Sequence, residues 1–210
     1  MARGLTGQLF GAGGLGVFAG LANEGAQVLR VAFSIQGQPS GQGLVIGDEA
    51  VAPVFGLVEA LRERYVVSDV VDLSPMEEDA IYLEGTGALV LDHTNRVAYV
   101  ARSGRAHTAA ALRWCSAMNY EAELFDTVDS KGAPIYHTNV VLSIGTEFVT
   151  AGLESIPDPA ERARVGARLT GSGREVVALD PGQIAEFAGN GLELLGAGGR
   201  RIFALSARAA

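Results

Sequence analysis

Two short motifs near the middle of the chain carry side chains that could act as an acid and a base. Glu84 stands in Leu-Glu-Gly-Thr-Gly, and His137 stands in Tyr-His-Thr-Asn, each just before a short β-rich run. A carboxylate can hold the N–H groups of a cationic or urea-like ligand, and an imidazole can transfer a proton near neutral pH. If the two motifs met at one site, the pair would suit acid–base chemistry on such a group.

Each motif also has a simpler interpretation. A single glutamate before Gly-Thr-Gly is commonly a solvated turn residue, and a single histidine is commonly a structural residue with its hydrogen bonds satisfied. The two residue types alone do not decide between the catalytic and the structural interpretation. The decision depends on whether the surrounding elements bring the motifs together.

A repeat in the predicted secondary structure gives the motifs a reason to meet. Strand, strand, helix and strand are predicted in turn, and the same order follows a second time after about 50 residues. The first unit covers 88–92, 97–103, 106–119 and 121–126, and the second covers 139–145, 147–156, 159–170 and 174–180. A pseudo-symmetric repeat would bring the loops before the two first strands, and so Glu84 and His137, toward a common axis.

The ends of the second predicted helix are well marked, and a further unit begins after it. Asp158 is an N-cap, Pro159 lies in the first turn, and Gly171 follows the last turn. Asp180-Pro181 then caps a short helix through Phe187, and the runs LELLG and RIFALS read as two more strands. This third unit is out of phase with the other two and stops in mid-pattern.

Composition divides the chain into two parts. Of 28 glycines in 210 residues, 13 fall in residues 1–56 with only 5 charged residues, whereas residues 57–210 hold 15 glycines and 35 charged residues. Glycine interrupts each candidate helix or strand of the first part. We therefore expect a glycine-rich segment over 1–56 and a separate α/β domain over 57–210.

Charge and composition exclude several classes of function. The net charge of −8 argues against nucleic acid as a partner. No apolar run approaches the roughly 20 residues that span a bilayer, and the sequence MARGLTGQLF lacks the pattern of a signal peptide, so we expect a cytoplasmic protein without a membrane partner. A single cysteine and three unclustered histidines predict no disulfide, no metal site and no other cofactor.

One motif favours a nucleotide, and it forms an alternative hypothesis. Gly11–Gly16 matches G-x-G-x-x-G, a loop in which the backbone approaches a pyrophosphate at a helix N-terminus. The motif requires a buried strand before it, a helix after it and an acidic residue about 20 positions later. The preceding run is a poor strand and the residue near the expected position is Arg30, so a match by chance in a glycine-rich segment is the simpler explanation.

Several longer motifs resemble a known family. They are YLEGTGALVLDHTNRVAYVARS, PIYHTNVVLSIGTEF, LESIPD and IAEFAGNGLEL, in this order within residues 57–208. They resemble amidinotransferase-like, arginine-deiminase-related proteins of the pentein superfamily, and among these the citrulline-utilisation hydrolases most closely. The resemblance implies an α/β fold, a five-bladed propeller of ββαβ modules. The chain would hold an incomplete pentein propeller, truncated at both ends.

The resemblance also implies roles for individual residues. Glu84 matches the glutamate that binds the guanidinium or ureido nitrogens, and His137 matches the catalytic histidine. Asn139 stands where arginine deiminases carry an aspartate, and Asn190 in Phe-Ala-Gly-Asn matches a motif at the active-site end of a strand. Gly85 lies beside Glu84 and is expected to contribute to substrate binding.

In the family, a cysteine in a Gly-rich segment near the C-terminus attacks the central carbon of the substrate and forms a covalent adduct. Such a segment would come after Ala210, and Cys115 lies on the apolar face of a predicted helix with Ala111, Leu112 and Met118. Buried thiols of this kind are usually inert. We therefore expect a hydrolase of a C–N bond in citrulline, arginine or a methylated relative that lacks its nucleophile and is inactive alone.

The main alternative is a non-catalytic remnant that binds a small guanidino or ureido amino acid or assembles with another chain. Loss of parts of the first and last blades would uncover strand edges and apolar surface, which favours association, including a homo-oligomer. The nucleotide hypothesis based on Gly11–Gly16 comes last.

Overall fold

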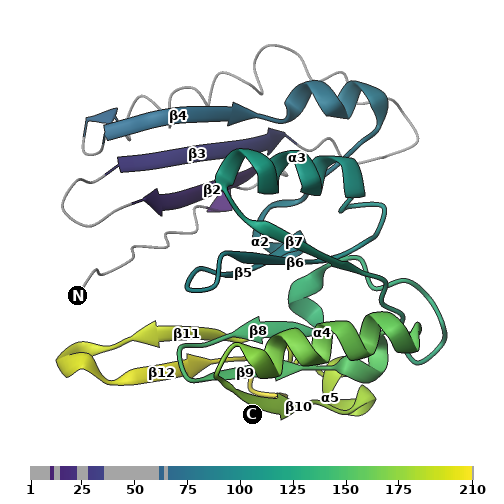
Figure 1. Cartoon of the computed structure of the whole chain (residues 1–210). Coiled ribbons are helices and arrows are strands. Elements are labelled where there is room, and N and C mark those ends of the chain that lie inside the picture. Colours follow the sequence, from purple (N-terminus) through teal and green to yellow (C-terminus); the bar gives the residue numbers. More distant parts are fainter. Residues whose placement is uncertain (1–9, 12–14, 23–27, 36–61, 64–65, 210) are drawn as a thin grey trace.

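The computed structural model describes residues 10–11, 15–22, 28–35, 62–63 and 66–209 (Figure 1). They form a mixed α/β fold of small sheets and few helices, as the sequence predicts at this level. Among the described residues, no helix combines the length and the apolar character that crossing a membrane requires.

Two three-stranded units repeat the same topology. In each, the first two strands are antiparallel, a helix follows, and the third strand pairs in parallel with the second. Unit 1 consists of β5 (Leu89–Asp92), β6 (Val97–Ala101), α3 (Thr108–Met118) and β7 (Glu121–Phe125). Unit 2 consists of β8 (Leu142–Ile144), β9 (Phe148–Ala151), α4 (Pro159–Gly171) and β10 (Glu175–Ala178). The predicted ββαβ order is therefore confirmed.

Short helical turns lie before and between these strands. They are η1 (Ser74–Asp79), α2 (Gly85–Ala88), η2 (Thr138–Val140) and η3 (Leu153–Ser155). Asp158 caps α4 as predicted, because its carboxylate accepts the backbone N–H groups of Ala160 and Glu161 at 2.7 and 3.0 Å. Two details differ from the sequence prediction. The run 139–145 is divided between η2 and β8, and Leu112 is exposed on α3, whose buried side carries Trp114 instead.

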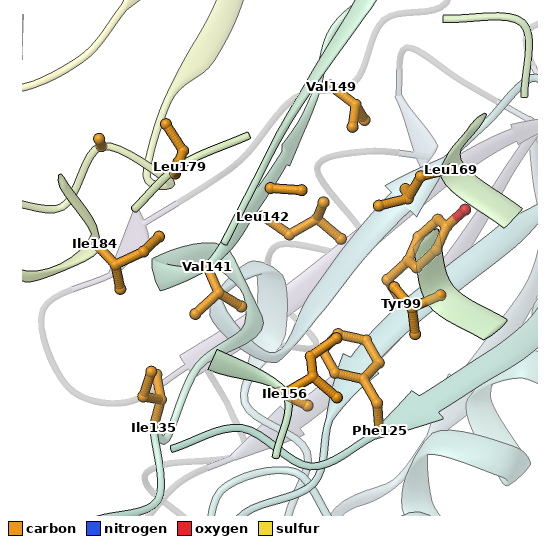
Figure 2. Close-up of a cluster of buried hydrophobic side chains, with 14 of the residues drawn as sticks. Tyr99, Phe125, Ile135, Val141, Leu142, Val149, Ile156, Leu169, Leu179 and Ile184 are labelled. Carbon is orange, nitrogen blue, oxygen red and sulfur yellow. The ribbon is translucent and has the colours of Figure 1, made fainter. Parts of the chain in front are cut away.

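The buried side chains form two hydrophobic clusters. The first joins α3 to the sheet of unit 1 and to Leu73, with Trp114 and Cys115 at its centre. The second, shown in Figure 2, contains Val165 and Leu169 of α4 together with Tyr99 of unit 1 and Val149 of unit 2. Because α4 packs on both sheets, the two units share this second cluster.

Buried charge also joins the units. Asp92 at the end of β5 forms two hydrogen bonds with the guanidinium of Arg174, at 2.6 and 3.1 Å, and both side chains are nearly inaccessible, at 1% and 9% exposure. Burial acts to raise the pKa of Asp92, but hydrogen bonds from Arg174 and Asn95 outweigh burial and hold this pKa below its ordinary value. Arg174 also donates to the carbonyl of Gly145. The guanidinium thus joins the end of β5 in unit 1 to the β8–β9 turn of unit 2.

A four-stranded sheet precedes the two units. It consists of β1 (Phe10–Gly11), β2 (Leu15–Ala22), β3 (Val28–Ile35) and β4 (Val66–Asp72), in that order. β2 and β3 are antiparallel and β3 and β4 are parallel, which is the pairing of the two units. The sheet therefore contains residues from both sides of the composition boundary at residue 56, including strands in a segment where the sequence predicted none.

The glycine motif does not have the structural context that a dinucleotide requires. Residues 12–14 lie outside the described residues, but β1 and β2 on either side pair as antiparallel strands, with Gly11 opposite Leu15. The motif therefore leads into a strand rather than the N-terminus of a helix. The nucleotide hypothesis loses its structural basis.

After unit 2, the chain forms α5 (Pro181–Ala185) and the antiparallel hairpin of β11 (Leu192–Leu195) and β12 (Arg201–Ala204), with the turn η4 (Ala197–Gly199) between the strands. Asp180 and Gln183 form a capping box at the start of α5, as expected for the predicted cap. In the part of the chain that the structure describes, β12 is followed by neither a helix nor a third strand.

Arg174→Met should destabilise the protein by about 3–5 kcal/mol at neutral pH, because it leaves the carboxylate of Asp92 buried without its charge partner. The matched control is Arg208→Met, whose ion pair with Glu186 is exposed and should contribute less than about 1 kcal/mol. Urea unfolding of both variants measures the difference.

The pH dependence gives a second check on the same ion pair. Since the pKa of Asp92 is lower in the folded than in the unfolded chain, its contribution is present above the unfolded-state value and is lost as the pH falls through the folded-state value. The destabilisation by Arg174→Met should therefore shrink in acid. A cost that stays constant from neutral to acidic pH would contradict this account.

Candidate active site

The structure brings Glu84 and His137 into direct contact. Nε2 of His137 is hydrogen-bonded to Oε2 of Glu84, and both side chains are mostly buried. Glu84 occupies the N-cap position of α2, but its carboxylate does not cap the helix. It therefore remains free to meet the imidazole from unit 2, as the repeat predicts.

The backbone around Glu84 is fixed by a turn and by a glycine. The N–H of Glu84 donates to the carbonyl of Arg105 at 2.9 Å, and its own carbonyl accepts from the N–H of Ala88. Gly85 follows with a φ of +40°, a left-handed conformation that favours glycine. Gly85 thus turns the chain beside the carboxylate.

The imidazole lies directly against the backbone of α2. A Cβ built on Gly87 would come within 2.7 Å of Nδ1 of His137. Any side chain at this position would displace the ring, so glycine permits the approach of unit 2 to α2. The ring of the neighbouring Tyr136 packs against the imidazole of His137, with the two ring centroids 4.7 Å apart.

An arginine that the sequence analysis did not single out completes this cluster. The guanidinium of Arg105 lies 3.4 Å from Oε2 of Glu84 and 4.7 Å from the centroid of the Tyr136 ring. The hydroxyl of Ser103 donates to the carbonyl of Tyr136 and so joins the turn after β6 to the loop before η2. Arg105 lies in the tight turn after β6. Its only indication in the sequence is that it is a polar residue in a loop after a strand, where functional residues are common.

The two asparagines differ in their surroundings. Oδ1 of Asn139 is buried and has no hydrogen-bond donor among the described residues. Asn190 is exposed, yet its motif packs against the same turn, because a Cβ on Gly189 would lie 2.2 Å from the carbonyl oxygen of Val140. The structure therefore brings the Phe-Ala-Gly-Asn motif to η2, which begins immediately after His137.

The chain's single cysteine lies away from these groups. Cys115 lies on the buried side of α3, and burial raises the pKa of its thiol to about 11. Such a thiol is a poor nucleophile at neutral pH. Its predicted role in core packing agrees with its position.

Two further features bound what the site can hold. Within the described residues, no group of three or more His, Cys, Asp or Glu side chains could hold a metal ion. A cavity of about 310 Å³ lies beside α5, where it includes Ala188 and Arg208, but it does not reach Glu84 or His137. The described chemistry is therefore that of a carboxylate, an imidazole and a neighbouring guanidinium.

Comparison with known proteins agrees with this geometry. The family match identifies the chain as a guanidino-group-modifying protein of the pentein superfamily. The family described as N,N dimethylarginine dimethylhydrolase, eukaryotic, matches residues 55–210, and the chain belongs to this family. A search of curated proteins finds no match.

Solved structures show the same fold. ArgZ, an arginine dihydrolase from the ornithine–ammonia cycle in cyanobacteria, matches in its apo form with a TM-score of 0.56 and 13% identity, covering 79% of this chain and 23% of that one. Its N-terminal domain bound to substrate matches with a TM-score of 0.55 and 12% identity, covering 83% of this chain and 55% of that one. The chain thus spans about a quarter of ArgZ and about half of its N-terminal domain.

Gly87→Ala should move His137 away from Glu84 and destabilise the protein by about 1–3 kcal/mol, as overpacking of a filled site does. Gly104→Ala, where a Cβ would meet open space, is the matched control. Thermal unfolding measures the cost, and the ¹⁵N shift of His137 Nε2 reports the loss of the contact. An unchanged shift in a folded Gly87→Ala protein would disprove the role of this glycine.

Proposed function

We propose that this chain carries the carboxylate and imidazole part of a guanidino-group hydrolase site. The hydrogen bond between Glu84 and His137 is the observation that carries the proposal. In this proposal Glu84 accepts the N–H groups of a guanidinium or ureido ligand, and His137 transfers a proton to and from the nitrogen that leaves. Residues 57–210 would form part of a pentein propeller.

The buried oxygen of Asn139 supports a ligand with N–H donors. A buried acceptor without a donor costs about 1–3 kcal/mol, and a ligand that supplies an N–H removes this cost. We propose that Asn139 accepts such a bond and that Asn190 and Gly85 border the same ligand. The relatives' names favour arginine, which is the substrate class of ArgZ, and dimethylarginine, which the matching family's name specifies.

The ligand must displace an existing contact. Glu84 already has the imidazole of His137 and the guanidinium of Arg105 as neighbours. Because the carboxylate of Glu84 already faces an imidazole and a guanidinium, it is suited to accept the N–H groups of a guanidino ligand in the same way. Exchange of one donor for another keeps the buried carboxylate satisfied throughout.

The proposed reaction needs a thiolate that Cys115 does not supply. In it, the thiolate adds to the central carbon of the ligand, an amine leaves with a proton from His137, and water then releases the product as His137 takes the proton back. Because the thiol of Cys115 is buried with a raised pKa, we propose that the isolated chain binds its ligand without turning it over.

Calorimetry on the purified chain tests binding. Nω,Nω-dimethylarginine, arginine and citrulline serve as ligands, and at least one should bind. Glu84→Gln should weaken this binding by about tenfold or more, the worth of a hydrogen bond to a charged group. Glu175→Gln, an exposed glutamate on β10, is the control and should leave binding unchanged. If none of the three ligands binds to the folded chain, the proposal is wrong.

Product analysis tests the second half of the proposal. Incubation of the chain with each ligand should release neither citrulline nor ornithine. Product formed by the wild-type chain and abolished by His137→Ala would contradict the claim of inactivity, while leaving the assignment of His137 intact.

A further inference from the structure

The segment that leads into Glu84 is held by a short antiparallel ladder. Its central pair is Leu83 and Ala106, and both residues are buried. On one side of this pair, the N–H of Glu84 donates to the carbonyl of Arg105 at 2.9 Å. The backbones that carry the carboxylate of Glu84 and the guanidinium of Arg105 are thus bonded to each other. Both groups of the candidate site depend on this ladder for their positions.

The other side of the ladder ends at His107, which bonds the backbone of Tyr82 twice. The N–H of His107 donates to the carbonyl of Tyr82 at 2.9 Å, and Nδ1 of its imidazole accepts the N–H of Tyr82 at 3.0 Å. In a regular antiparallel ladder, the carbonyl of His107 would accept that N–H. Here this carbonyl accepts the N–H of Ala111 in the first turn of α3 instead. The imidazole therefore replaces a backbone carbonyl in the ladder.

His107 is also the N-cap of α3, but its side chain does not cap the helix. The N-caps of α4 and α5 are Asp158 and Asp180, and each accepts backbone N–H groups of its own helix. Histidine is not among the residues preferred at an N-cap. The side chain at the start of α3 thus serves the segment before Glu84 rather than its own helix.

The bond to Tyr82 also determines which ring nitrogen of His107 carries the proton. A backbone N–H can only donate, so Nδ1 must offer a lone pair, and the proton of the neutral ring lies on Nε2. Nδ1 lies 3.3 Å from the carbonyl oxygen of Tyr82 as well, but this oxygen already accepts the N–H of His107. The imidazole acts here as an acceptor.

We propose that His107 is a positioning residue of the candidate site, whose imidazole fixes the backbone before Glu84 so that the carboxylate meets His137 and a guanidino ligand. Without this acceptor, the N–H of Tyr82 would lose its partner in the ladder, and the chain entering α2 would gain freedom. The site would then bind ligand less tightly, because more freedom is lost on binding. The effect on affinity rests on the proposed function, whereas the contact between Glu84 and His137 can be measured without a ligand.

Two substitutions at His107 test the proposal. The amide oxygen in His107→Asn lies as many bonds from Cβ as Nδ1 does and can accept the N–H of Tyr82, whereas His107→Leu has no acceptor. Calorimetry with Nω,Nω-dimethylarginine, arginine and citrulline should show binding weakened by about fivefold in His107→Leu, the worth of one hydrogen bond. The ¹⁵N signal of His137 Nε2 should shift in the same variant. His107→Asn should retain most of the wild-type affinity and the wild-type signal.

His93→Leu is the matched control. Nδ1 of His93 is hydrogen-bonded to the hydroxyl of Tyr120 at 2.6 Å, and His93 follows β5 at the end opposite α2. This variant also removes a hydrogen bond between a histidine and a tyrosine of unit 1, but it leaves the ladder intact. It should change neither the ligand affinity nor the signal of His137.

The wild-type chain provides a check that needs no variant. At neutral pH, ¹⁵N spectra should show Nδ1 of His107 without a proton, and a proton there would overturn the proposal even if His107→Leu does not fold. The proposal is also overturned if folded His107→Leu keeps the wild-type affinity or the wild-type signal of His137, or if His107→Asn or His93→Leu has the same effect as His107→Leu. If the wild-type chain binds none of the three ligands, the proposed function fails, and the signal of His137 alone decides whether His107 positions Glu84.

Discussion

The hydroxyl of Thr138 determines how the two units meet. This side chain has no exposed surface, donates to the carbonyl of Ala88 and accepts the N–H of Ala101 at 2.8 Å. Ala88 ends α2 and Ala101 ends β6, so the hydroxyl of Thr138, the first residue of η2, satisfies one buried backbone group in α2 and one in unit 1. His137 immediately precedes Thr138. The hydrogen bonds of Thr138 thus help to position the imidazole of His137 relative to Glu84.

Close backbone approach makes this arrangement possible, and two glycines permit it. Gly87 lets the ring of His137 lie on α2, and Gly189 lets the chain after α5 lie on the carbonyl of Val140. Buried ion pairs then hold unit 1 and unit 2 together. Arg168 of α4 forms an ion pair with the buried carboxylate of Glu123 on β7 at 2.7 Å, and Arg174 does the same for Asp92. Each buried carboxylate is thereby matched to a guanidinium from the other unit.

The sequence predicts local structure here better than tertiary contacts. The caps at Asp158 and Asp180 and the ββαβ order could be read directly, because they depend on neighbouring residues and on hydrophobic periodicity. The exposure of Leu112 could not, since a helical stripe leaves open which of two adjacent apolar columns faces the sheet. The strands of the glycine-rich segment were missed because they form by pairing in one sheet, in which β3 pairs with the distant β4, and their own composition does not indicate strands.

The candidate site shows the same division. The repeat was sufficient to predict that Glu84 and His137 meet, but Arg105 gave no comparable signal, because it reaches the site through a turn that follows β6. Nor does the sequence show that the carbonyl oxygen of Asn139 is buried without a donor. That fact depends on the packing of η2 between two units, which only the assembled structure contains.

The repeat also explains why a pseudo-symmetric fold forms an asymmetric site. Glu84 and His137 each lie five residues before the first leucine of a unit's first strand, Leu89 and Leu142. The residue five positions before Leu192 in the third hairpin is Phe187, which is exposed and has a φ of +64°. The same position thus carries a carboxylate, an imidazole and an apolar ring in turn. Symmetry brings the first two together, and the difference between their side chains creates an asymmetric pair, a carboxylate hydrogen-bonded to an imidazole.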